Sequence, residues 1–306
     1  MGGVLTGFAI VGFVVAVGYV IGRTGIAGPG GQYVLNRVAF FVFTPALLFV
    51  TLADANVKVL FSSMLVVAVG SAVAAGAIFW AVSVLFLKRD TAETVIGVLS
   101  SSYVNANNIG LPVAVFVLGS SSFVAPVLLF QLVLFAPLAL TVLDISTSGR
   151  TSVRQVATIP LRNPMILASL AGILVAVFGL HIPAPIIEPF TLIGGAAIPT
   201  VLIAFGMSLH GSVPLNVADR RADVITAVIV KSAVMPGIAF LIARFAFGMS
   251  GHHLFAVVTL AALPAAQNVF NFASRYDRAI GVARDSVLLS SIVAIPAMVV
   301  ISALLT

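Results

Sequence analysis

The sequence predicts an all-α integral membrane protein, and three observations support this fold class. Hydrophobic residues make up 61% of the 306 positions and charged residues only 8%, whereas a soluble domain carries roughly 25% charge. Apolar runs close to the twenty or so residues that cross a bilayer recur along the chain. The segments between them are short and contain Gly, Pro and charged residues. We therefore expect lipid to be the solvent for nearly the whole chain, with no separate soluble domain.

The apolar runs predict ten transmembrane helices. The first run lacks a basic N-terminal region and a small-residue cleavage signal, so we expect it to be retained as a helix rather than removed as a signal peptide. The predicted spans lie near residues 4–22, 33–52, 60–87, 94–118, 123–143, 164–181, 187–209, 223–247, 253–274 and 285–305.

The basic residues predict the orientation of these helices, because cytoplasmic loops carry an excess of Lys and Arg. If both termini lie outside, only Lys58 and Arg244 among the loop cations fall on the outer side. The net charge of +6 comes from scattered loop residues and not from a basic stripe, which argues against a nucleic-acid partner. We expect a multi-pass protein of the inner (plasma) membrane. The predicted cytoplasmic cations are Arg23, Lys88, Arg89, Arg150, Arg154, Arg162, Arg220, Arg221, Arg275, Arg278 and Arg284.

An internal repeat divides the chain into two halves at an offset of about 160 residues. The first five helices would begin outside and the second five inside, so the halves would be inverted relative to each other, as in many secondary carriers. The predicted division is a first repeat over 1–145, a short cytoplasmic connector over 146–162 and a second repeat over 163–306. The anchors pair 127–129 and Pro137 with 287–289 and Pro296, Pro45 with Pro199, and Asn107 with Asn268.

Two of the predicted helices contain polar, proline-bearing segments, 100–112 and 262–271, that do not suit contact with lipid. Amide side chains in hydrocarbon need hydrogen-bonding partners, and Gly and Pro weaken the helical ladder. Two broken helices in corresponding positions are a sequence pointer to a transport site. The candidate substrate-binding residues are Asn105, Asn107, Asn108, Gln131, Lys231, Gln267, Asn268 and Asn271, and the candidate hinge residues at the crossover are Gly110, Pro112 and Pro264.

Two readings of these amides remain open at the level of sequence. They could serve as structural links between helices, or they could bind a transported solute. The free N–H groups at half-helix N-termini favour an anion such as a carboxylate. Asn oxygens and freed carbonyls could equally hold a cation, which would place a sodium site near Asn107 and Asn268. No cofactor is expected.

Lys231 is the cation predicted deepest in the membrane, about 12 Å from the cytoplasmic surface at 1.5 Å per residue. An ionisable residue at that depth is a functional candidate. It could neutralise an anionic substrate, or occupy a fixed-cation position that removes the need for sodium. We expect every Asp and Glu to lie in a loop or at a helix end, so a proton relay would lack its usual carboxylates.

The chain offers little for enzymatic chemistry. Cys is absent, which excludes disulfides, thiolate metal sites and Cys nucleophiles. The predicted spans contain no Ser, His and Asp constellation and no set of metal ligands, and we expect the neighbouring His252 and His253 to be interfacial. The sequence therefore predicts a protein that is not an enzyme.

Several short motifs follow one another in a set order along nearly the whole chain. They are Asn36-Arg37 with Pro45, Asn105 with 110–112, Lys231 with Pro236, 262–264 with Phe270, 272–273 and Tyr276, and Pro296. Together they resemble the auxin efflux carrier family, which includes bacterial organic-acid carriers and the plant PIN-FORMED proteins. The connector after Asp144 is much shorter than the long cytoplasmic loop of the plant carriers.

The resemblance implies a fold similar to that of the bile-acid symporters and sodium/proton antiporters. Helices 1, 2, 6 and 7 would form a scaffold, and helices 3–5 and 8–10 a transport domain that moves in an elevator-like cycle. The implied substrate is a small organic anion, a carboxylate that could be auxin-like or a dicarboxylate. Exposed apolar faces of helices 2 and 7 suggest a homodimer. The alternatives are a sodium-coupled organic-anion symporter and, from another class, an ion channel or membrane sensor.

Overall fold

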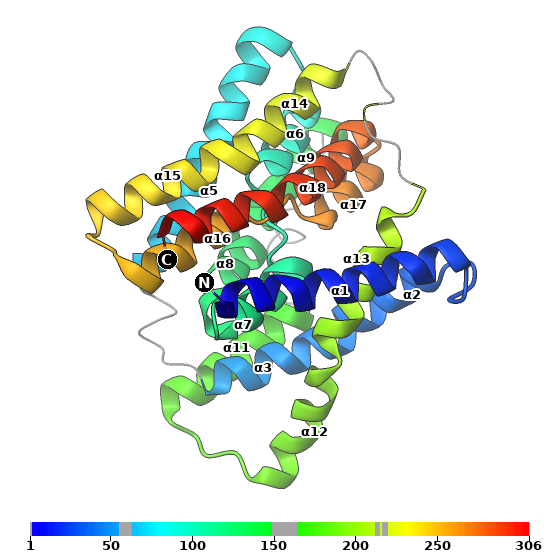
Figure 1. Ribbon diagram of the computed structural model, residues 1–306. Helices are drawn as coiled ribbons and strands as arrows, with labels where there is room; N and C mark the ends of the chain where they lie inside the picture. The colour runs from blue at the N-terminus through cyan, green and yellow to red at the C-terminus, as the bar shows by residue number, and fades with distance from the viewer. Residues whose placement is uncertain (1, 55–62, 149–163, 212–214, 216–219, 306) are drawn as a thin grey trace.

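The regular secondary structure is helical in the part of the chain that the computed structural model describes, residues 2–54, 63–148, 164–211, 215 and 220–305 (Figure 1). One isolated β-bridge, between Val104 and Ala265, is the exception within these residues. The helices of the first half are α1 (Gly2–Thr24), α2 (Gly31–Val38), η1 (Ala39–Phe43), α3 (Thr44–Ala53), α5 (Ser63–Val82), η2 (Ser83–Leu87), α6 (Thr91–Ser102), η3 (Ala106–Gly110), α7 (Leu111–Phe116), η4 (Ser121–Phe123), α8 (Ala125–Phe130), η5 (Gln131–Phe135) and α9 (Ala136–Ser148).

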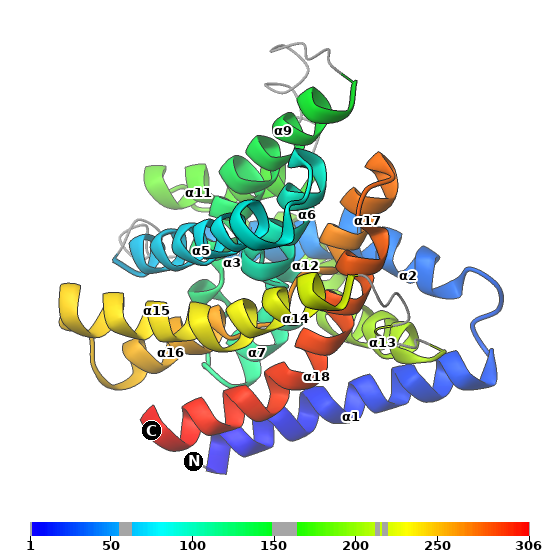
Figure 2. The same cartoon turned by 90° about the horizontal axis from the view of Figure 1, so that it is seen from above.

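The second half continues the helical pattern. Its helices are α11 (Pro164–Phe178), α12 (Ala184–Gly195), α13 (Ala197–Leu209), α14 (Arg221–Ile229), η8 (Val230–Val234), α15 (Met235–Leu241), η9 (Ile242–Ala246), α16 (Gly251–Ala261), α17 (Gln267–Tyr276) and α18 (Ile280–Leu305). The start of α1 and the end of α18 lie near each other in both views (Figures 1 and 2).

Within the described residues, five continuous helices are long and apolar enough to cross a membrane. Further apolar helices of 10–17 residues accompany them, for example Gly251–Ala261. The predicted class, a multi-pass α-helical membrane protein, is therefore confirmed. The five long helices are Gly31–Ala53, Ser63–Leu87, Ala184–Met207, Arg221–Ala246 and Ile280–Leu305.

Four short π-helical segments occur where proline interrupts the regular ladder. Proline has no N–H to donate to the carbonyl four residues earlier, and a wider turn accommodates the missing bond without ending the helix. Each of these segments ends two residues before a proline, as η8 does before Pro236. The other three are η1 before Pro45, η3 before Pro112 and η5 before Pro137.

One group of helices, α1, α2, α3, α11, α12 and α13, occupies the lower part of Figure 1. Glycines let its backbones approach closely. A Cβ atom on Gly206 of α13 would collide with the backbone of α1 at Val15, and one on Gly172 of α11 would lie 2.7 Å from the Phe49 carbonyl oxygen of α3. Small residues at such contacts allow the tight van der Waals packing that drives helix association in lipid.

The remaining helices form a second group, of which α5, α14, α15 and α18 lie above α1 in Figure 1. Two ion pairs join the start of α6 and the residues just before it to the start of α14. Arg89 donates from both Nε and an Nη atom to the Asp223 carboxylate, and Arg220 donates from two Nη atoms to Glu93. The hydrogen bond to Glu93 raises the pKa of the Arg220 guanidinium.

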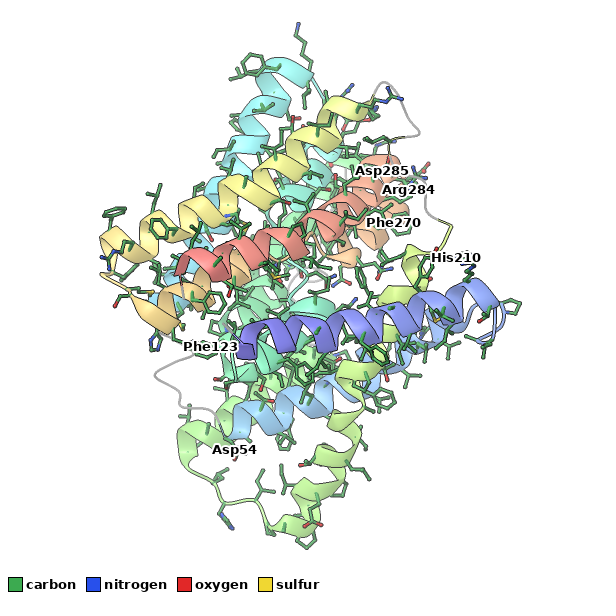
Figure 3. The ribbon with its side chains drawn as sticks, in the orientation of Figure 1. Asp54, Phe123, His210, Phe270, Arg284 and Asp285 are labelled. Atoms are coloured by element: carbon green, nitrogen blue, oxygen red, sulfur yellow. The ribbon has the colours of Figure 1, made fainter. Side chains whose placement is uncertain are left out.

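Asp285 departs from the expectation that all carboxylates lie in loops or at helix ends. Helix α18 begins at Ile280, earlier than predicted, so Asp285 lies inside the helix and is 2% exposed. Its carboxylate accepts from Arg284 Nε at 2.7 Å and from the Leu215 backbone N–H at 2.8 Å. Figure 3 labels both side chains near the start of α18. The charge is buried because it has both an ionic partner and a backbone donor.

Candidate functional site

Two interrupted helices cross at the centre of the molecule. Helix α6 stops at Ser102 and helix α16 at Ala261, and the chain resumes as a helix at Ala106 and Gln267. The two extended segments pair antiparallel. Asn105 donates its backbone N–H to the Pro264 carbonyl at 2.8 Å, and Ala266 donates to the Tyr103 carbonyl at 2.9 Å. Each interruption therefore satisfies backbone groups of the other, as buried polar groups in a membrane require.

Local side chains complete the first interruption. The hydroxyls of Ser100, Ser101 and Ser102 donate hydrogen bonds to carbonyl oxygens of the preceding turn, at 2.6 to 2.9 Å. Asn105 then caps the next helical segment, because its Oδ1 accepts from the Asn108 backbone N–H at 3.1 Å. Each of these partners lies within four residues in the sequence.

Distant residues complete the second interruption. The Ala265 N–H, which would donate to the Ala261 carbonyl in a continuous helix, donates to Ser290 Oγ of α18 at 3.0 Å. The Ala261 carbonyl accepts instead from Lys231 Nζ at 2.7 Å. No side chain caps the first turn of α17, which follows Ala266. Its leading N–H groups therefore give this end of the interruption a partial positive charge.

A cavity of about 470 Å³ opens beside the crossing. One wall is α2 with η1, and the other walls come from η3, α9 and the first turns of α17. Its polar lining is mostly amide side chains, and its only charged lining residue within the described chain is Arg37. The lining residues are Tyr33, Asn36, Arg37, Ala39, Phe40, Phe41, Tyr103, Asn107, Asn108, Leu132, Ala136, Pro137, Leu140, Gln267, Asn268, Asn271 and Phe272.

Three of the clustered amides have a buried polar atom without a hydrogen-bond partner in the described structure: Oδ1 of Asn107, Oε1 of Gln267 and Nδ2 of Asn105. The Asn107 amide is oriented by its other end, since its Nδ2 donates to Asn108 Oδ1 at 2.9 Å. Unpaired buried polar atoms are costly. Their clustering shows that the site has unused capacity for both a donor and an acceptor of hydrogen bonds.

The structure brings seven of the eight candidate substrate-binding residues to this region. Asn107, Asn108, Gln267, Asn268 and Asn271 line the main cavity. Asn105 and Gln131 line an adjoining cavity of about 20 Å³, which also touches Asn107, Asn108 and Asn268. That space suffices for about one water molecule.

Lys231 is the candidate that the structure places elsewhere. It lines neither of the two cavities, and its side chain is 0% exposed. The ammonium lies against the end of α16, bound to the Ala261 carbonyl and 3.4 Å from Met235 Sδ.

The candidate hinge residues take different positions. Pro264 lies inside the second interruption, and its carbonyl accepts from Asn105. Gly110 and Pro112 lie beyond the first interruption, in η3 and α7. A Cβ atom on Gly110 would lie 2.9 Å from Leu263 Cδ1, so a larger residue there would force the Leu263 side chain of the second interruption to shift.

Sequence reasoning missed the wall that α2 contributes. The sequence indicated Asn36 and Arg37 only as part of a family motif. Helix α2 is amphipathic, and this pattern could have identified a solvent-facing surface. Arg37 donates to the Tyr33 hydroxyl at 2.9 Å, and its guanidinium lies 5.4 Å from the centre of the Phe41 ring. Tyr103 was also missed; it lines the same cavity as Asn268.

A multi-pass helical protein with a polar cavity where two interrupted helices meet has the architecture of a membrane transporter. Sequence comparison agrees: the chain belongs to the family described as membrane transport protein, whose model matches residues 4–150 and 141–302. The resemblance to the auxin efflux carriers is thereby confirmed at the family level, and the family is one of membrane transport.

Curated relatives carry the same assignment. The chain is 25% identical over 273 residues to the "Uncharacterized transporter YfdV" of Escherichia coli K12, a match that covers 86% of this chain and 85% of the relative. Transporters of the same name from Escherichia coli O157:H7 and Shigella flexneri match at the same identity and coverage.

Proposed function

We propose that the protein carries small organic anions, with a carboxylate bound in the cavity beside the crossing of the interrupted helices. The amides of Asn107, Asn268 and Gln267 would bind and orient the solute, with Asn105, Asn108, Gln131 and Asn271 completing the site. The observation that carries the proposal is the charge balance of the cavity: it combines an uncapped helix N-terminus with Arg37, and the lining that is described contains no carboxylate. Such a site attracts a negative charge.

For the architecture, we propose ten spans in two inverted repeats, 1–145 and 163–306, joined by the connector 146–162. The antiparallel pairing of the two interruptions supports this arrangement, as does the nearness of the start of α1 to the end of α18. The helix group that contains α1, α3, α11, α12 and α13 would be the scaffold. The group around the crossing would move against it in an elevator-like cycle.

Transport in proteoliposomes tests the proposed function. The purified protein would be supplied with a panel of labelled mono- and dicarboxylates, including an auxin-like indole carboxylate, and compared with the Asn107→Ala and Asn268→Ala variants. We expect uptake of at least one carboxylate and a loss of about tenfold or more in each variant, the effect of one hydrogen bond to a charged group. Undiminished uptake in both variants would remove the cavity as the binding site.

A specific observation favours a second candidate, a sodium-coupled organic-anion symporter. The Oδ1 of Asn107 and the Oε1 of Gln267 are buried acceptors without a partner in the described structure, and uncharged oxygens of this kind are ligands for hard cations. The sodium site would lie near Asn107 and Asn268. Replacing sodium with choline on both sides of the membrane distinguishes the candidates, because only the symporter would stop.

We further propose that the protein resides in the inner membrane with both termini outside, and that it pairs through apolar faces of α2 and α12. Val34 and Leu192, at 56% and 81% exposure, mark those faces. Because the natural sequence contains no Cys, single cysteines can be introduced without background. Labelling of a terminal cysteine in intact cells tests the orientation, and crosslinking of Leu192→Cys tests the pairing.

A further inference from the structure

Lys231 is a fully buried cation that the cavity does not use. It lies in η8, within the span Arg221–Ala246, and its side chain is 0% exposed. Its ammonium has two partners in the described structure, the Ala261 carbonyl oxygen at 2.7 Å and Met235 Sδ at 3.4 Å. No described carboxylate forms an ion pair with it. A buried charge of this kind is expensive unless the site is built to receive it.

The end of α16 is built to receive a cation. Ala261 is the last residue of that helix, where carbonyl groups carry a partial negative charge. The N–H that would have satisfied the Ala261 carbonyl, that of Ala265, is engaged by Ser290. The interruption therefore creates an acceptor at the negative end of a helix dipole, and Lys231 supplies the donor.

The contacts of Lys231 with other helices fix where this charge can act. Helix α16 packs against both α15 and α18, and η8 also contacts α18. Lys231 from η8 and Ser290 from α18 thus hold the two sides of one interruption. Snorkelling does not describe this lysine, because no part of its side chain reaches the surface.

In transporters, carbonyl groups at the ends of broken helices are ligands for coupling cations. We propose that the Lys231 ammonium is a resident cation at such a position, a positioning residue that fixes the end of α16 and makes the crossing independent of an alkali ion. The contact of the Lys231 ammonium with the Ala261 carbonyl does not depend on which solute is carried. Its consequence for transport rests on the proposed carrier function.

Three variants test the inference. Lys231→Ala removes the equivalent of a propylammonium ion and leaves its space, Lys231→Met removes the charge but fills the space, and Lys231→Arg keeps a cation. We expect wild-type uptake to be unchanged when choline replaces sodium. We expect uptake to fall about tenfold in Lys231→Met, as for the loss of a hydrogen bond from a charged donor, and less in Lys231→Arg.

Added propylammonium provides the readout that a purely structural lysine would not give. In detergent, we expect propylammonium to raise the unfolding temperature of Lys231→Ala and to have no effect on the wild type or on Lys231→Met, since ligand that binds only the native state stabilises it. In proteoliposomes, the same ion should restore uptake by Lys231→Ala alone.

The outcomes separate this inference from the proposed function. Sodium dependence of wild-type uptake, full uptake by Lys231→Met, or failure of propylammonium to stabilise folded Lys231→Ala would each overturn it. If Lys231→Ala does not fold, the sodium and Lys231→Met measurements still decide. If the wild type carries no carboxylate but propylammonium stabilises Lys231→Ala, the resident cation stands and the proposed function fails.

Discussion

The two interrupted helices satisfy the backbone groups left unpaired at the interruption by different means. At the first interruption, hydroxyls of Ser100, Ser101 and Ser102 and the side chain of Asn105 satisfy backbone groups within four residues. At the second, the partners are Lys231 and Ser290, which lie 30 and 25 residues away in the sequence. The first interruption is therefore largely encoded in its own segment, whereas the second exists only when η8 and α18 are in place.

The helical segments that follow the two interruptions also differ in how their N-termini are capped. The segment after the first interruption is capped by Asn105, so its leading N–H group at Asn108 is already used. The segment after the second has no side-chain cap and opens on the cavity through Gln267 and Asn268. The crossing thus combines one helix N-terminus that is capped by its own segment with a second N-terminus that is uncapped and available to a solute.

Replacing the prolines should give the largest contrast. Pro264→Ala restores an N–H inside the second interruption and would let α16 continue, so we expect uptake to fall about tenfold or more. Pro112→Ala acts inside an existing helix, where η3 already accommodates the missing bond, and should cost less than about threefold. Initial uptake rates of reconstituted protein provide the measurement. Equal losses would show that the two interruptions are equivalent.

Removing one serine from each interruption should give a smaller, measurable difference in stability. Ser290→Ala leaves the buried Ala265 N–H without its partner, which costs about 1–3 kcal/mol. Ser101→Ala should cost less than about 0.5 kcal/mol, because the Val98 carbonyl still accepts from the Ser102 hydroxyl. Unfolding in mild detergent compares the pair. A larger loss for Ser101→Ala would contradict the assignment of distant and local support.

The cap at Asn105 offers a test within the first interruption. Asn105→Ala removes the acceptor for the Asn108 N–H and should destabilise the protein by about 1 kcal/mol, whereas Asn105→Ser retains a neutral capping oxygen. The expected order of unfolding temperatures is therefore Asn105→Ser above Asn105→Ala. If the two variants proved equally unstable, the cap to the Asn108 N–H would not be what Asn105 contributes.

The ion pair between Arg220 and Glu93 should show the smallest effect. It links α6, which leads into the first interruption, to the start of α14, the helix that continues to Lys231. Its side chains are 26% and 18% exposed, so a double-mutant cycle with Arg220→Gln and Glu93→Gln should give a coupling of about 1 kcal/mol or less. A coupling energy larger than the stability loss of Ser290→Ala would show that this ion pair, and not the crossing, is the stronger link between the helices.

Much of the molecule follows from local sequence. Composition identified the membrane class, and Pro112 was expected to weaken its helix, where the structure shows the π-helical segment η3 just before it. The amides at 105–108 and 267–271 were recognisable because polar side chains in an apolar run are conspicuous. The burial of Asp285 was missed because its helix starts a turn early and its donor, Leu215, is 70 residues away.

The sequence by itself determined that the chain is a helical membrane protein with two interrupted, amide-bearing helices, because span length, proline and polarity act over a few neighbouring residues. Only the tertiary structure decided which partners complete the second interruption. In the folded protein, Lys231 binds the Ala261 carbonyl and does not line the cavity, whereas Arg37 of α2 lines the cavity together with the amides. Such pairings depend on contacts between distant segments, for which the spacing of residues along the chain carries no direct signal.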